Sequence, residues 1–335
     1  MIIAIDIGGT KIAAAAIEPQ HAEPIRSEVL RRPTPHREGG PAIAAVCAEL
    51  IAELRADYRH ACAVGIGAAG AVSRDGRRIT ASTDAIVNWA GTPLADLVEQ
   101  ACQLPVAVEN DVAAHARGEC VYGAGRGHES VVMMALGTGI GGAFILDGAH
   151  MFGRRGLAGD MGHLPLSTPA ATQLRCTCGT DGAHLEAVAS GPGIYRWYLE
   201  RGGDPNVADT RELAERARQG EALAGEVIAD AARQVGTALA GVANIIDPDI
   251  VVVGGGVPEI GPLWWEPAQA AYAAAIVPYL AEVPMVPATV GWRAALLGAA
   301  ALAEATFAPS SAPVPTPAPA HSATSQSTPI QAGDS

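Results

Sequence analysis

The sequence predicts a two-domain α/β fold. The chain has 335 residues, 49% of them hydrophobic, which is enough for two domains with separate cores. Predicted strands and helices alternate along it. One pattern, an apolar strand followed by a glycine-rich turn and a second apolar strand, occurs near residues 2–17 and again near 130–146. This repetition indicates two domains that each present a loop of the size that binds phosphate.

The first half begins with a predicted β-hairpin. Residues 2–5 and 12–17 are apolar, and residues 6–11 supply the turn between them. Hydrophobic spacing and turn residues predict the elements that follow. These are a helix at 41–55, a strand at 62–67, a turn at 73–76, a helix at 92–101, a strand at 105–109 and a helix at 111–121.

The second half repeats the hairpin and then becomes mainly helical. The apolar runs 130–136 and 143–146 flank the glycine-rich turn 137–142. The later predicted elements are helices near 184–200, 209–219 and 221–245, a buried strand at 250–253, and helices at 264–281 and 293–306. From about Pro309 the composition changes to Pro, Ser, Thr, Ala and Gln. Such a segment buries too little apolar surface to fold, so we predict that residues 307–335 are disordered.

Composition and charge exclude several classes of function. The net charge is −13 and no Lys/Arg cluster exceeds a doublet, which argues against a nucleic-acid surface because such a surface needs concentrated positive charge. No apolar run reaches the roughly 18–20 residues of a membrane span, and Met1 opens directly into a strand without the pattern of a signal peptide. Four of the six cysteines are scattered, which is typical of reduced thiols. We therefore expect a cytoplasmic protein without a membrane partner.

The glycine-rich turns predict phosphate binding. Residues 65–70 and 137–142 match the dinucleotide pattern on paper, but that pattern requires a strand–turn–helix unit, and a Walker loop would need a longer spacer between its glycines. We therefore reject both. Successive N–H groups in the two hairpin turns can instead hold phosphate oxygens, with Thr10 and Thr138 adding hydroxyls. Asp6 is placed to hold Mg²⁺ through water; the alternative is an Asx contact that only stabilises the turn.

The segment Glu109-Asn110-Asp111 follows a strand and begins a helix. Helix capping alone would explain Asn110 and Asp111. In the functional interpretation, Asp111 is the general base that accepts the proton of an attacking hydroxyl in phosphoryl transfer, and Asn110 binds a sugar hydroxyl. Capping and catalysis are compatible at one site.

A group of cysteines and histidines predicts a zinc site. Cys176 and Cys178 lie one residue apart, with His163 before them and His184 after them. A Cys-x-Cys pair alone could equally be core or surface, but two thiolates with two imidazoles suit tetrahedral zinc. We expect a structural zinc ion that fixes the loop carrying His163 and Glu186.

Taken together, these motifs resemble those of the ROK family (repressors, open reading frames and sugar kinases), most closely its bacterial glucokinases. The resemblance runs from Met1 to about Thr306. It rests on several ordered motifs: Asp6-Ile-Gly-Gly-Thr-Lys11, Glu109-Asn-Asp111, Leu136-Gly-Thr-Gly-Ile-Gly-Gly142, Gly159-Asp-Met-Gly-His163, Cys176-Thr-Cys-Gly179, Leu185-Glu186 and Val253-Gly-Gly-Gly256.

The resemblance implies an actin-like, ribonuclease-H-like pair of domains with ATP in the cleft between them. We expect a small domain at 1–111, with helix 293–306 packing back on it, and a larger domain at 112–292. The resemblance also implies that the chain forms a homodimer. Residues at family donor-side positions are Asp6, Gly8, Gly9, Thr10 and Lys11, then Gly137, Thr138 and Gly139, then Gly254, Gly255 and Gly256. Residues at sugar-side positions are Asn88, Asn110, Asp160, His163 and Glu186, and Asp111 falls at that of the catalytic base.

Two departures from the family pattern affect the expected substrate and metal. The family usually has Glu where this chain has Asp160, and a third cysteine where this chain has Ala183-His184. We expect His184 to complete the zinc ligands.

The favoured hypothesis is an ATP-dependent kinase of the glucose 6-hydroxyl, aided by Mg²⁺. The alternatives are a kinase of N-acetylmannosamine, fructose or a C7-cyclitol of aminocyclitol antibiotic biosynthesis, and, more distantly, a sugar-responsive regulator. Regulators of the family carry a helix-turn-helix ahead of the first hairpin, and here the hairpin begins at residue 2.

Overall fold

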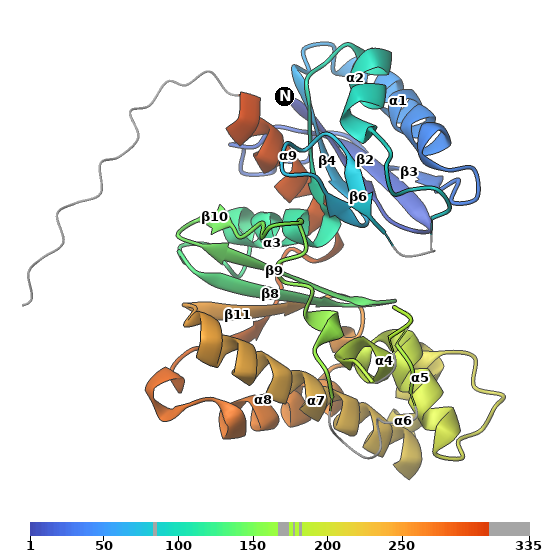
Figure 1. Ribbon diagram of the computed structural model, residues 1–335, viewed down its shortest axis with the longest axis vertical. Helices are drawn as coiled ribbons and strands as arrows, with labels where there is room; N and C mark the ends of the chain where they lie inside the picture. Colours follow the sequence, from blue (N-terminus) through green and yellow to red (C-terminus); the bar gives the residue numbers. More distant parts are fainter. Residues whose placement is uncertain (83–85, 167–173, 177, 181–182, 308–335) are drawn as a thin grey trace, which may run out of the picture.

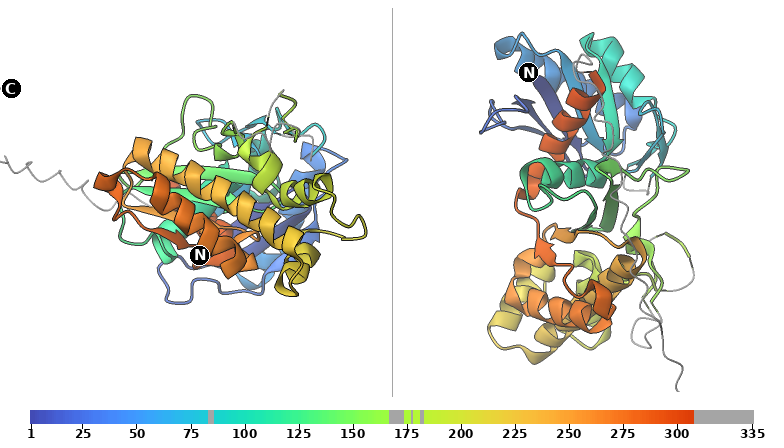
Figure 2. Two further views of the ribbon diagram at one scale, coloured as in Figure 1. Left: turned by 90° about the horizontal axis from the view of Figure 1, so that it is seen from below. Right: turned by 90° about the vertical axis from the view of Figure 1, so that its left-hand side faces the viewer.

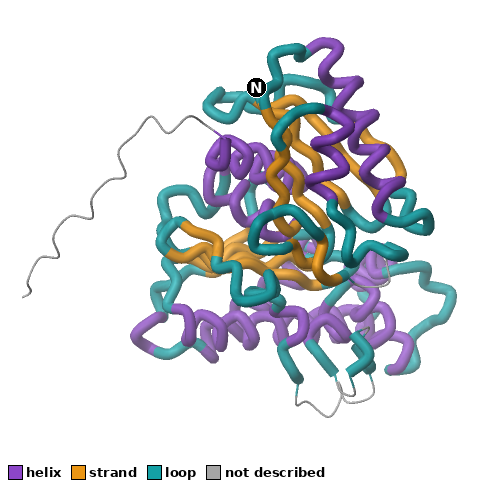
Figure 3. The backbone as a smooth tube through the Cα atoms, turned by 45° about the horizontal axis from the view of Figure 1, so that its top comes forward, coloured by secondary structure: helices purple, strands orange, loops and turns teal. Residues whose placement is uncertain are grey.

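Two five-stranded sheets with helices on their faces make up the protein (Figures 1 and 3). The computed structural model describes residues 1–335 except 83–85, 167–173, 177, 181–182 and 308–335. The predicted disordered tail therefore lies outside the described residues, apart from Phe307, which ends a helix.

The two sheets have the same strand order and the same strand directions. In the first, β2 (Lys11–Ile17) pairs antiparallel with one side of β1 (Ile2–Ile7), and β3 (Leu30–Pro33) pairs antiparallel with β2. On the other side β4 (Ala63–Ala68) pairs parallel with β1, and β7 (Val106–Asn110) pairs parallel with β4. The second sheet repeats this arrangement around β8. Its strands are β10 (Ala149–His150), β9 (Ile140–Leu146), β8 (Val131–Leu136), β11 (Ile250–Gly254) and β12 (Met285–Pro287). The repeated domain plan expected from the sequence is confirmed.

Alternation along the strands divides the first sheet into two buried faces. Ile3, Ile5 and Ile7 of β1 face a core shared with α1 (Gly40–Asp57) and α2 (Leu94–Cys102). Ile2 and Ala4 face the opposite side, where α9 (Ala294–Phe307) packs. Figure 2 shows α9 lying against this sheet although it is the last described helix of the chain.

A layer of helices covers the face of the second sheet that is turned away from the first sheet. Val132 and Met134 of β8 pack into the core formed with this layer, in which α7 (Ala222–Ile246) and α8 (Pro262–Ala275) lie side by side (Figure 2). The layer comprises α4 (Leu185–Ala189), α5 (Gly191–Glu200), α6 (Thr210–Arg218), α7 (Ala222–Ile246) and α8 (Pro262–Ala275).

None of the helices in the described part of the chain combines the length and the apolar character needed to cross a membrane.

Helix α3 (Asp111–Tyr122) lies between the two sheets and packs on both α9 and the second sheet. Ala113 and Ala116 contact the core that includes Val131 and Met133. The backbones of α3 and α9 approach closely, since a Cβ at Gly298 would lie 1.7 Å from the carbonyl oxygen of Ala114. This helix therefore links the two halves, and the domain boundary expected at residue 111 remains a prediction.

Several short elements differ from the sequence expectations. The helix expected at 184–200 is two helices, because Ser190 ends α4 and caps α5, its Oγ accepting from the Gly193 N–H at 3.1 Å. The helix expected at 264–281 ends at Ala275, before the 3-10 turn η4 (Pro278–Leu280). Strands β3, β10 and β12, and the hairpin of β5 (Ala71–Val72) and β6 (Ile79–Ala81), were not predicted. They are two to four residues long, too short for a period-2 pattern to reveal them. The remaining 3-10 turns are η1 (Met161–His163), η3 (Pro258–Ile260) and η5 (Gly291–Arg293).

Candidate active site

Asp111 lies where strand β7 ends and helix α3 begins. Asn110 caps the helix, its Oδ1 accepting from the N–H groups of Val112 at 3.0 Å and Ala113 at 3.1 Å. The Asn110 Nδ2 donates to Asp111 Oδ1 at 2.9 Å and to the carbonyl oxygen of Gly70 at 3.0 Å. The capping residue therefore also holds the Asp111 carboxylate in one orientation.

Two carboxylates influence each other at this point. Burial raises the pKa of Asp111, an effect opposed by its hydrogen bond from the Val112 N–H. Burial, with the nearby negative charge of Asp111, raises the pKa of Asp6 to about 7 against the lowering effect of Lys11. A carboxylate with a raised pKa is a stronger base, and two such groups close together favour a divalent cation between or beside them.

A cleft of about 560 Å³ lies between the two halves of the molecule. It is lined from the first half by Asn110, Asp111 and the segments around Gly70 and Ala81, and from the second half by loops of the other sheet. Among the sequence-predicted residues, the cleft brings together Asn110, Asp111, Gly137, Gly139, Asp160, His163, Glu186 and Gly255.

Other predicted residues do not line this cleft among the described residues: Asp6, Gly8, Gly9, Thr10, Lys11, Asn88, Thr138, Gly254 and Gly256. Asp6 is nevertheless close enough to Asp111 for the charge of Asp111 to affect it. Asn88 is exposed and has a left-handed backbone, φ 51°. Its predicted contact with sugar remains a prediction.

The glycine turns have the hairpin geometry that the sequence predicted. In the first turn the Gly8 N–H donates to the Lys11 carbonyl at 3.0 Å, and in the second the Gly137 N–H donates to the Gly139 carbonyl at 2.9 Å. Gly255 packs against the second hairpin with φ 91°, and a Cβ there would lie 2.1 Å from the carbonyl oxygen of Leu136. Only glycine fits this close approach.

Glu186 lines the same cleft as Asp111 but comes from the second half of the chain. It is in the first turn of α4, and its Oε2 accepts from the Ile140 N–H at 2.8 Å, which ties the helix to the start of β9. Asp160 also lines the cleft, and its Oδ1 is 3.1 Å from His163 Nδ1. Carboxylates and an imidazole facing one cavity can bind several hydroxyl groups of a polyol.

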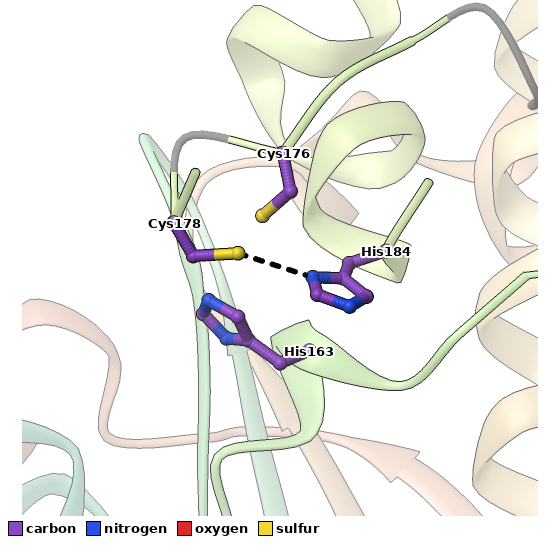
Figure 4. A group of neighbouring side chains, drawn as sticks. All are labelled: His163, Cys176, Cys178 and His184. Carbon is purple, nitrogen blue, oxygen red and sulfur yellow. Dashed lines mark hydrogen bonds between the residues drawn. The ribbon is translucent and has the colours of Figure 1, made fainter. Parts of the chain in front are cut away.

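The four predicted zinc ligands lie together in the structure (Figure 4). One donor atom from each of His163, Cys176, Cys178 and His184 lies within 4.8 Å of all the others. The Sγ of Cys178 is 3.4 Å from His184 Nδ1, and hydrogen bonding with Thr180 lowers the pKa of the Cys178 thiol to about 6. Two thiolates and two imidazoles at such separations fit tetrahedral zinc.

Sequence reasoning did not identify several residues of the cleft. These are Gly70, Ala81, Ser82, His150 and the segment 156–158. The one available signal was the glycine pattern at 65–70, since Gly70 has φ 98° and its carbonyl accepts from Asn110.

Comparisons with known proteins agree with this geometry. The ROK family model matches residues 2–306. The glucokinase of Streptomyces coelicolor is 33% identical over 320 residues, which cover 90% of this chain and 97% of that protein. The crystal structure of a ROK family glucokinase from Streptomyces griseus, in complex with glucose and AMPPNP, matches with a TM-score of 0.76 and 33% identity. The match covers 91% of this chain and 99% of that chain. The structure of the ROK hexokinase from Thermus thermophilus matches with a TM-score of 0.77 and 33% identity, over 91% of this chain and 98% of that chain.

Proposed function

This chain belongs to the ROK family, and from that premise we propose that it is an ATP-dependent kinase of the primary 6-hydroxyl of a free hexose, most specifically glucose. The observation that carries the proposal is the oriented, partly buried carboxylate of Asp111, which lines the same cleft as Gly137, Gly139 and the polar side chains assigned to the sugar. Phosphoryl transfer depends mainly on such positioning, with little covalent chemistry from the protein.

In the proposed mechanism Asp111 is the general base. The hydroxyl oxygen of the sugar forms a bond to the γ-phosphorus of ATP while its proton passes to the Asp111 carboxylate. The bond from the γ-phosphorus to the bridging oxygen breaks, and ADP leaves with that electron pair. Burial, which raises the pKa of Asp111, suits it to accept this proton.

The donor-side roles follow from the turns. We assign the triphosphate to Gly8, Gly9, Thr10 and Lys11 on one side and to Gly137, Thr138 and Gly139 on the other, with the adenosine near Gly254, Gly255 and Gly256. Asp6 would hold Mg²⁺ through water, since its carboxylate lies near a second negative charge that a cation would offset. When bound, Mg²⁺ neutralises charge on the triphosphate.

The sugar-side roles go to Asn88, Asn110, Asp160, His163 and Glu186. The cysteine–histidine cluster would hold a structural Zn²⁺, because its four side chains already lie together and His163 belongs to both the cluster and the cleft. A bound zinc ion would hold η1 and the start of α4 in position relative to each other. The homodimer and the cytoplasmic location expected from the sequence remain proposals, for which light scattering and cell fractionation are the measurements.

A second substrate class is favoured by Asp160. This carboxylate is one methylene shorter than the Glu typical of the family, and in the structure it is exposed and contacts His163. A kinase of N-acetylmannosamine, fructose or a glucose-like cyclitol is therefore the alternative. Sites that bond hydroxyl groups can discriminate by roughly 10⁴–10⁵, so a coupled ATP-consumption assay over a sugar panel separates these substrates.

The test of the proposed function is Asp111→Asn. We expect turnover of the preferred hexose to fall by about 10²–10⁴ while sugar binding, measured by calorimetry, is largely kept. Asp57→Asn, which removes an exposed carboxylate at the end of α1, should leave turnover unchanged. Full turnover in Asp111→Asn would remove Asp111 from the mechanism, and a wild-type chain that phosphorylates no sugar of the panel would contradict the kinase assignment.

A further inference from the structure

A second hollow, of about 340 Å³, adjoins the cleft. Ala81 and Leu157 line both cavities, so the two share part of their walls. The segment that bounds the hollow continues along the chain through Ala158 to Asp160 on the sugar side, whereas the donor-side glycines belong to other turns. The hollow therefore adjoins the part of the cleft wall that leads to Asp160, to which the proposed function assigns the sugar.

Arg74 is held at the edge of this hollow by contacts between the two halves. It lies in the turn between β5 and β6, and its guanidinium carbon is 5.0 Å from the centre of the Phe152 ring. Its Nη2 donates to the carbonyl oxygen of Gly153 at 2.8 Å. Stacking on an aromatic ring orders the guanidinium and leaves other N–H groups at its edge for a ligand.

Arg154 and Arg155 line the same hollow, and both are exposed. Neither forms an ion pair with a carboxylate of the described chain, in contrast to Arg77 nearby, which pairs with Asp96 and Glu99. Asp75, the neighbour of Arg74 in the sequence, already accepts from the Ser73 hydroxyl and the Arg77 N–H. Asp160, five residues after Arg155, contacts His163 instead.

The hollow therefore concentrates positive charge in a protein whose net charge is −13. Gathering three guanidinium groups without a carboxylate costs electrostatic energy, and a bound anion offsets that cost. Guanidinium groups match phosphate oxygens in bidentate geometry better than other side chains do.

We propose that the hollow bounded by Arg74, Arg154 and Arg155 is an oxyanion subsite for a phosphate-class group at the acceptor end of the cleft. The group is either a substituent of the sugar, remote from the reacting hydroxyl, or a free phosphate. The hypothesis that the anion is part of the sugar substrate rests on the proposed kinase function, whereas anion binding itself does not.

The test compares two double variants with the same change in charge. Arg154→Gln with Arg155→Gln removes two arginines from the hollow. Arg59→Gln with Arg126→Gln removes two exposed arginines that have no ion pair within the described residues and do not line the hollow. Calorimetry would measure the binding of inorganic phosphate and of glucose 1-phosphate, with AMPPNP at saturation to fill the donor site.

We expect at least one probe to bind the wild-type chain and to bind about tenfold or more weakly to the hollow variant, with the control unchanged. Equal affinities in the two variants, or no binding to the wild type at about 10 mM, which is weaker than a working subsite requires, would overturn the proposal.

Steady-state kinetics distinguish the two sources of the anion. If the sugar carries it, the KM for glucose 1-phosphate rises in the hollow variant while the KM for glucose is unchanged. If the anion is free phosphate, both KM values stay constant and only the binding of inorganic phosphate is lost. Failure to phosphorylate any sugar would overturn the kinase function without affecting the calorimetric result, and normal turnover with unchanged anion binding would overturn the subsite alone.

Discussion

The carboxylate of Glu119, on α3, lies 2.8 Å from the backbone nitrogen of Val290, in the segment that leads into α9. Glu119 is fully buried, and it also accepts from the backbone N–H groups of Thr289 at 3.1 Å and Ala124 at 3.0 Å. A buried charge is thus balanced by backbone donors. This contact joins the helix that begins at Asp111 to the chain that returns to the first sheet.

Glu119→Gln should destabilise the protein. The amide places an NH₂ group among backbone donors, which leaves at least one buried N–H without an acceptor, at a cost of about 1–3 kcal/mol. Urea unfolding should show this loss. Glu129→Gln, at an exposed site whose side chain makes no hydrogen bond within the described residues, should change stability by less than about 0.5 kcal/mol. Equal stability of the two variants would contradict the role of Glu119.

Gly298→Ala should be strongly destabilising, because the added methyl group would lie 1.7 Å from the backbone oxygen of Ala114 and force α3 and α9 apart. We expect a loss of about 1–3 kcal/mol or more. Gly241→Ala, within α7 where a Cβ meets nothing within 4 Å, should instead stabilise by about 0.5–1 kcal/mol. Opposite signs in thermal unfolding are the expected outcome, and two variants shifted alike would argue against close packing of α3 and α9.

Asn110 permits capping and catalysis to be separated. Asn110→Ala removes the cap and should lower the free energy of unfolding by about 1 kcal/mol. Turnover should fall as well, because the amide that orients Asp111 is lost. Asn110→Ser keeps a capping oxygen and should recover most of the stability. It cannot donate to Asp111 as the amide does at 2.9 Å, so turnover should stay about tenfold or more below wild type. Wild-type turnover in the serine variant would show that the amide does not orient Asp111.

Cys178→Ser tests the metal cluster. We expect one zinc ion per wild-type chain by atomic emission, and loss of most of it in the variant, with a lower thermal midpoint because the cluster joins η1 to the start of α4. The KM for sugar should rise as well, since His163 lies in both the cluster and the cleft. The matched control is Cys62→Ser, at an exposed thiol outside the cluster. Equal zinc content in the two variants would refute the site.

Local sequence patterns were sufficient for much of the fold. The glycine turns between apolar runs predicted both hairpins, and the strand–helix junction predicted the cap at Asn110 and the position of Asp111. The spacing of Cys176, Cys178 and the two histidines predicted a cluster that the structure brings together. These features depend on residues within about 25 positions of one another, where turn chemistry and periodicity act directly.

What the sequence alone determined is therefore the set of local elements, the repeated domain plan and the type of chemistry available. The tertiary structure decided which segments meet: the pairing of β3 and β12 as edge strands, the buried joint of Glu119 with Val290, and the entry of residues 156–158 into the cleft wall. It also left Asn88 outside the cleft lining. Such contacts join residues that are distant in the chain, and their free energy comes from burial and packing between complete elements, which no local pattern records.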